Sequence, residues 1–193
     1  MLITECGKQL SGEISGTLIT PPEGTPLSEL AAVIWGMAKA YADDGRVFFQ
    51  NGDTVNALAS FYYGFAWLHF GRSYGLLSSS TENSPACPFT GANEKLPASL
   101  SAKLSEKSHR YHRLLDTACE SVVPAPEPET SGGMFARRVI LIAISYAGGG
   151  EGSLSRGEDE EALARFSYGH GWLDAGVRSG LLIPSRNREI FTI

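Results

Sequence analysis

The sequence predicts an all-α fold: a helical bundle of two tandem repeated three-helix units packed as an intrachain pseudo-dimer. Residues 157–182 repeat residues 52–77 at an offset of 105 positions without a gap. Apolar residues recur at helical spacing in both copies, and proline- and glycine-rich segments separate the helices. Because three helices offer too little surface to bury a wholly apolar helix, we expect the two copies to pack against each other.

The repeated segment keeps its glycines, aromatic residues and leucines in place, which indicates a duplicated structural unit. Gly64 and Gly71 are seven positions apart and share one helix face, where the missing side chains allow another helix to approach closely. The paired positions include Gly52/Gly157, Ala57/Ala162, Leu58/Leu163, Ala59/Ala164, Phe61/Phe166, Tyr63/Tyr168, Gly64/Gly169, Trp67/Trp172, Leu68/Leu173, Gly71/Gly176, Gly75/Gly180, Leu76/Leu181 and Leu77/Leu182.

Three helices are expected in the first copy. A short helix over residues 2–18 carries apolar residues at every fourth position, although its glycines weaken it. Thr25, followed by a proline, is typical of a helix N-terminus, and helical spacing continues over residues 26–50. Asp53 then caps a third helix over residues 54–74, which is apolar on nearly every side and therefore expected to be buried.

The second copy follows the same order, with two differences in its later helices. Gly148, Gly149 and Gly150 lie inside its second helix and cost roughly 2–3 kcal/mol relative to alanine, so we expect a kink or fraying there. The acidic run 158–161 falls at the start of its third helix, where negative charge favours the helix dipole. We interpret this run as capping rather than as metal binding.

These patterns divide the chain into a first repeat at residues 1–80, a linker at 81–103 and a second repeat at 104–193. The linker is rich in serine, proline, glycine and asparagine and shows no periodicity. Hydrophobic residues make up 42% of the chain, which is enough for a folded core.

Charge and cysteine content narrow the functional classes. The net charge is −5, which argues against nucleic-acid binding through a broad basic surface. The three cysteines are widely spaced and suit a reducing cytoplasm better than a disulfide framework. We find neither a signal-peptide pattern nor an apolar run long enough to span a bilayer. We therefore expect a cytoplasmic protein without a membrane partner.

One run in the second copy resembles a known family. The pattern is a helix ending in G-D or G-E, then A-L-A, then Y-x-x-G-W-L-D-A-G and a final G-L-L, and residues 104–184 follow it best. It resembles the archaeal family called domain of unknown function 357. In the first copy, His69 and Phe70 stand where the second has Asp174 and Ala175. The resemblance implies a small all-helical unit and an archaeal cytoplasmic protein, and it implies no activity.

The third helix of the second copy carries the candidate catalytic residues. His170, Asp174 and Arg178 are four apart and share one helix face, so the aspartate could orient the histidine as a proton carrier. A surface ladder of ion pairs is the alternative interpretation. Arg165 and His170 also form R-x-x-x-x-H, which is similar to the motif of HEPN ribonucleases, metal-independent enzymes built on helical bundles.

A second candidate group lies on the first helix of the second copy. His109 and His112 are three apart and could ligate a metal with help from Glu106, but a solvated helix face is the simpler interpretation. We therefore predict no metal site and no cofactor. The leading functional hypothesis is a non-enzymatic interaction or scaffold module that binds a protein partner or itself. The alternative is a HEPN-like ribonuclease or phosphodiesterase with a site between the repeats, acting on nucleic acid.

Overall fold

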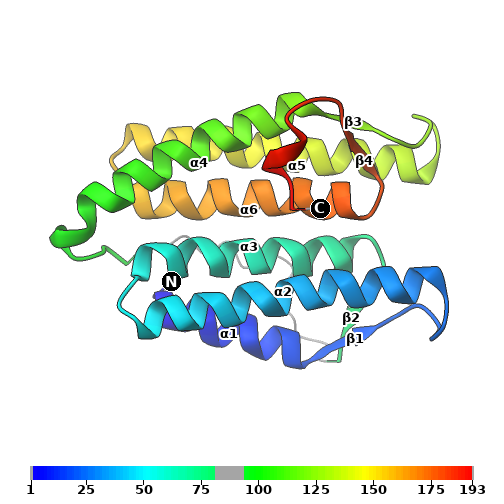
Figure 1. Cartoon of the computed structure of the whole chain (residues 1–193), viewed down its shortest axis with the longest axis horizontal. Coiled ribbons are helices and arrows are strands. Elements are labelled where there is room, and N and C mark those ends of the chain that lie inside the picture. Colours follow the sequence, from blue (N-terminus) through cyan, green and yellow to red (C-terminus); the bar gives the residue numbers. More distant parts are fainter. Residues whose placement is uncertain (1, 81–93, 193) are drawn as a thin grey trace. The chain divides into compact units, whose positions relative to one another are not determined.

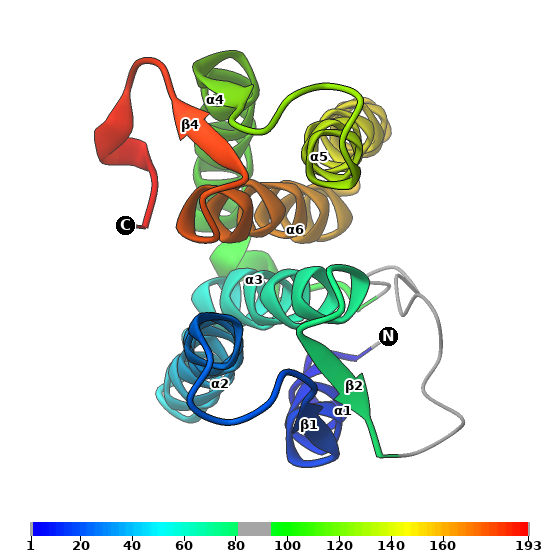
Figure 2. The same cartoon turned by 90° about the vertical axis from the view of Figure 1, so that its right-hand side faces the viewer.

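Each repeat is a unit of three helices closed by a pair of short antiparallel strands (Figures 1 and 2). The structure is a computed structural model, and it describes residues 2–80 and 94–192. The chain divides into two units, Met1–Leu96 and Pro97–Ile193. The all-α class and the repeated architecture are thereby confirmed.

The elements follow one another in the same order in both units. The first unit contains α1 (Ile3–Ser15), β1 (Thr17–Ile19), α2 (Pro26–Gln50), α3 (Thr54–Ser73) and β2 (Leu77–Ser79). The second contains the 3₁₀ turn η1 (Ala98–Leu100), α4 (Ser101–Ser121), β3 (Val122–Pro124), α5 (Ser131–Ser155), α6 (Asp159–Arg178), β4 (Leu182–Pro184) and the 3₁₀ turn η2 (Arg188–Ile190).

The helix starts of the first unit are set by local side-chain chemistry. The Thr25 hydroxyl accepts a hydrogen bond from the Ser28 amide at 3.2 Å, and a proline occupies the first position of α2. The Asp53 carboxylate accepts from the Asn56 amide at 3.2 Å and caps α3. These caps satisfy amide groups that have no partner inside the helix, and both were expected from the sequence.

The second repeat begins earlier than the expected linker boundary. Helix α4 starts at Ser101, inside the stretch 81–103 that the sequence assigns to the linker. The 3₁₀ turn η1 directly precedes it and follows Pro97. Residues 81–93 of that stretch lie outside the described residues.

The two strand pairs were missed by the sequence analysis. Strand β1 pairs with β2, with Thr17 opposite Ser79, and β3 pairs with β4, with Val122 opposite Pro184. Each strand has three residues, which is too short for the alternation of polar and apolar residues to be recognised. The pairing joins the end of each unit's first helix to the segment after its third.

Glycines on the third helix bring the three helices of each unit close together. A Cβ on Gly64 would lie 2.8 Å from Leu10 of α1, and one on Gly169 would lie 2.9 Å from Leu115 of α4. Gly71 likewise faces β2, where its Cβ would be 2.5 Å from Leu77. The predicted close approach along this face is confirmed, and it is the same in both repeats.

The fraying expected at the glycine run is absent, because the run lies inside one continuous helix. Helix α5 continues through Gly148, Gly149 and Gly150 to Ser155. Gly150 lies under the Phe166 ring, where a Cβ would clash, and its counterpart Gly45 lies under Phe61. Burial of the aromatic ring against the bare helix backbone therefore outweighs the low helix propensity of glycine.

Candidate functional site

In each unit, the first and second helices approach an aromatic ring of the third, and in the first unit they form a groove over it. In the first unit the ring is Phe61, and the groove contains a mainly apolar pocket of about 400 Å³ whose lining includes Lys8 and Arg46. Its lining residues are Ile3, Thr4, Gly7, Lys8, Ser11, Arg46, Phe49 and Phe61. The ring in the second unit is Phe166, which lies 105 positions after Phe61.

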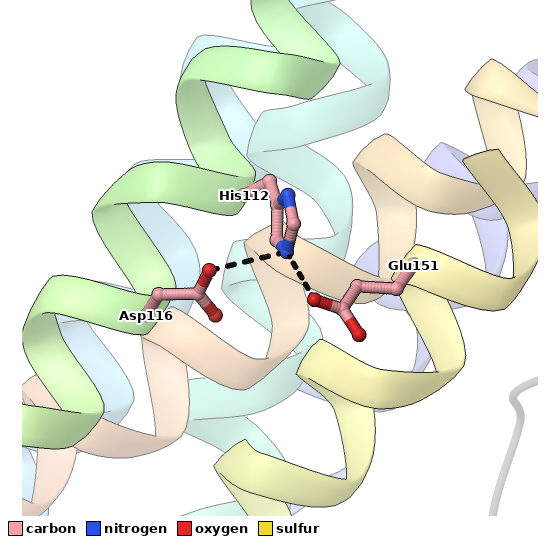
Figure 3. A group of neighbouring side chains, drawn as sticks. All are labelled: His112, Asp116 and Glu151. Carbon is pink, nitrogen blue, oxygen red and sulfur yellow. Dashed lines mark hydrogen bonds and ion pairs between the residues drawn. The ribbon is translucent and has the colours of Figure 1, made fainter. Parts of the chain in front are cut away.

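Three polar side chains gather between α4 and α5 of the second unit. His112 and Asp116 are one turn apart on α4, and Glu151 reaches them from α5 (Figure 3). The offset of 105 places them at the positions of Gly7, Ser11 and Arg46. The His112 ring stacks on Phe166, with 4.9 Å between ring centroids and 19° between planes.

The His112 imidazole points between the two carboxylates. Its Nε2 lies 2.9 Å from Oε1 of Glu151 and 3.1 Å from Oδ2 of Asp116 (Figure 3). One ligand atom from each residue falls within 4.8 Å of the others. Among the residues that the structure describes, this is the one group of three or more such side chains spaced to hold a metal ion.

The carboxylates of this cluster stand close to one another. Partial burial raises the pKa of Asp116, His112 acts against that shift, and the negative charges of Glu151 and Glu120 add to it. A single imidazole therefore does not balance the negative charge around Asp116.

The first unit holds a different ionic cluster, between α1 and α3. Arg72 donates hydrogen bonds to the Glu13 carboxylate and, at 3.3 Å, to the Glu13 carbonyl oxygen. His69 Nε2 lies 3.7 Å from the same carboxylate, and Gln9 donates to it at 3.0 Å. The Glu13 side chain is only 9% exposed.

Its partners determine the charge state of Glu13. Burial alone would raise the pKa of this carboxyl, but interactions with His69, Gln9 and Arg72 outweigh it and lower the pKa to about 2. Glu13 is therefore ionised at neutral pH, and the cluster ties α1 to the end of α3. The sequence analysis missed it because Glu13 is distant from α3 along the chain.

The structure brings His170 and Asp174 together under the C-terminal tail, the described residues 185–192 that follow β4. His170 Nε2 lies 3.8 Å from Asp174 Oδ1 and 3.2 Å from the carbonyl oxygen of Ile190. The Asp174 carboxylate accepts a hydrogen bond from the Thr192 amide at 3.2 Å. Both side chains are buried, and Phe191 lies near the His170 ring. The tail thus covers two of the four predicted catalytic residues.

The two arginines of the predicted site have different surroundings. Arg165 forms an ion pair with Glu161 at 2.8 Å and extends over Gly149 of α5. Arg178 is exposed in the last turn of α6. His170 is instead directed toward the tail that follows β4. The structure therefore joins His170 to Asp174 and directs Arg165 toward α5.

His109 and His112, which the sequence analysis weighed as metal ligands and set aside, have different partners in the structure. His109 Nδ1 lies 2.8 Å from the carbonyl oxygen of Ser105 on its own helix, and Glu106 pairs with Arg110 at 3.2 Å. Only His112 takes part in a cluster with metal-ligand spacing. Asp116 could have been found from its spacing of four after His112, whereas no local pattern indicates Glu151.

A comparison with family models identifies both repeats. A model described as "protein of unknown function (DUF357)" matches residues 8–77 and again residues 110–182. No curated protein and no solved structure matches the chain. In the described part of the chain, none of the helices has the length and apolar character needed to cross a membrane.

Proposed function

We propose that this chain, which belongs to the DUF357 family of proteins of unknown function, is a non-enzymatic interaction module that associates with a second copy of itself. The outer face of α5 carries the proposal, because it exposes three large apolar side chains. Met134, Leu141 and Ile144 are 57%, 62% and 51% exposed. An apolar stripe on an exposed helix face is typical of a helix-docking surface.

Gly148 supports a second copy as the occupant of this face. It lies seven positions after Leu141, and a Cβ there would meet nothing within 4 Å. Glycine inside an exposed helix costs about 1 kcal/mol relative to alanine, and no contact within the unit accounts for it. Antiparallel, two-fold pairing of α5 centred on Leu141 places Met134 of each copy opposite Gly148 of the other. The Met134 side chain of each copy then occupies the space that Gly148 of the other copy leaves without a side chain.

The contact is expected to be weak. One pair of helices buries less than the roughly 1,200 Å² that is usual for stable protein interfaces. The fraction of dimer should therefore depend on protein concentration in the micromolar range. Monomers and dimers should interconvert rapidly. Arg137 lies on the same face as the stripe, one turn from both Met134 and Leu141, whereas Arg138 borders it; both side chains are exposed.

Replacing Leu141 by glutamate should abolish self-association because it places a charge at the centre of the contact. Sedimentation velocity over a range of concentrations should show a monomer–dimer equilibrium for the unmodified protein and a monomer for Leu141→Glu. Ile183→Glu is the matched control, because Ile183 is 51% exposed but lies on β4. A protein that stays monomeric at millimolar concentration, or a Leu141→Glu variant that still dimerises, would contradict the proposal.

A HEPN-like ribonuclease remains the alternative, and the adjacency of His170 and Asp174 favours it. It requires Arg165 and Arg178 to act with them on RNA. The interaction module predicts no cleavage of single-stranded RNA in the presence of a metal chelator. Cleavage that His170→Gln abolishes, with folding unchanged, would establish the nuclease in its place.

A further inference from the structure

We propose that His112, Asp116 and Glu151 form a binding site for one divalent transition-metal cation, with Zn²⁺ as the representative ion. The site lies wholly within the second unit, between α4 and α5 (Figure 3). The inference does not depend on self-association through α5.

The ligand atoms suit such an ion in type and spacing. One imidazole nitrogen and two carboxylate oxygens form a mixed set that first-row transition metals accept. Zinc binds these atoms at about 2.0–2.2 Å, so tetrahedral ligand atoms lie roughly 3.3 Å from one another. The His112 nitrogen lies 2.9 Å from Glu151 and 3.1 Å from Asp116. Small rotations of the two carboxylates would admit the ion.

The imidazole is held in position by the fold. Stacking of His112 on the fully buried Phe166 fixes the plane of the ring. The spacing of four on α4 brings Asp116 to one side of Nε2, and the packing of α5 brings Glu151 to the other. With three protein ligands, an ion would keep at least one position for water or a substrate, as in open metal sites.

The local charge favours a cation. Two carboxylates face one imidazole; Glu120 adds negative charge near Asp116, although it pairs with Arg186 at 3.0 Å. A neutral imidazole, which is the form that ligates metals, would leave this charge uncompensated. A divalent ion would neutralise both carboxylates and bind the imidazole nitrogen at the same time.

The first repeat supplies an internal comparison. Its groove has Gly7, Ser11 and Arg46 at the three ligand positions, so it lacks all three donors and carries a positive charge where Glu151 stands. The proposal therefore predicts a single ion per chain despite the duplication.

Isothermal titration of the metal-free full-length protein with Zn²⁺ tests the site. We expect one ion per chain, and affinity at least tenfold weaker in His112→Gln and in Glu151→Gln. His109→Gln and Glu106→Gln are the matched controls, because both residues lie on the same helix outside the cluster. Both controls should stay within twofold of the unmodified protein. Circular dichroism should confirm that all four variants keep their helical content.

Titration with Co²⁺ identifies the ligand atoms. Visible d–d absorption without a thiolate charge-transfer band is expected, because the site contains nitrogen and oxygen donors only. A thiolate band would place the ion on a cysteine such as Cys119 instead. The proposal is overturned by that result, by the absence of binding, or by binding that is equally strong in His112→Gln and Glu151→Gln.

Discussion

Replacing Phe166 by alanine is expected to lower the free energy of unfolding by about 3–5 kcal/mol. The ring is fully buried, lies against the bare backbone of Gly150 and supports the His112 ring. Removing it leaves a cavity that rigid helices cannot close. Urea unfolding followed by circular dichroism measures the change.

Phe49→Ala is the control for this prediction, because Phe49 is the same residue type but 36% exposed. We expect it to cost less than half as much. Phe61→Ala should reproduce the large effect in the first unit, since Phe61 packs on Gly45 in the same way. A loss below about 1 kcal/mol for both Phe166→Ala and Phe61→Ala would refute the packing of the third helices described above.

Replacing Arg72 by methionine is expected to lower the free energy of unfolding by about 3 kcal/mol at neutral pH. The change removes a partner of a carboxylate that is 9% exposed, and a buried charge that loses its partner is strongly destabilising. Arg46→Met, which removes an exposed pair with Asp43, should cost no more than about 0.5 kcal/mol. Equal losses in the two variants would exclude a structural role for the Glu13 cluster.

The same cluster predicts how stability changes with acid. The pKa of Glu13 falls from 4.5 to about 2 on folding, so its contribution is complete above pH 4.5 and is lost as pH falls toward 2. The shift corresponds to about 3 kcal/mol. The free energy of unfolding, measured from pH 6 to pH 2, should fall less steeply for Glu13→Gln than for the unmodified protein. Parallel curves would contradict the assignment.

The sequence alone was sufficient for the features that depend on neighbouring residues. The offset of 105 revealed the duplication, and the second and third helices of the first copy begin at their expected caps, Thr25 and Asp53. A helix cap and a helical period each depend on residues that are close together in the sequence. They can therefore be recognised without knowing the rest of the fold. The close approach at Gly64 was predictable for the same reason.

Tertiary packing decided the features that join distant residues. The glycine run at 148–150 has low helix propensity, yet the buried Phe166 ring keeps α5 continuous. The strand pairs, the Glu13 cluster and the convergence of His112 with Glu151 each join residues more than 35 positions apart. Local periodicity carries no information on which turn of one helix faces which turn of another. That register follows only from how the side chains of the whole unit fill its core.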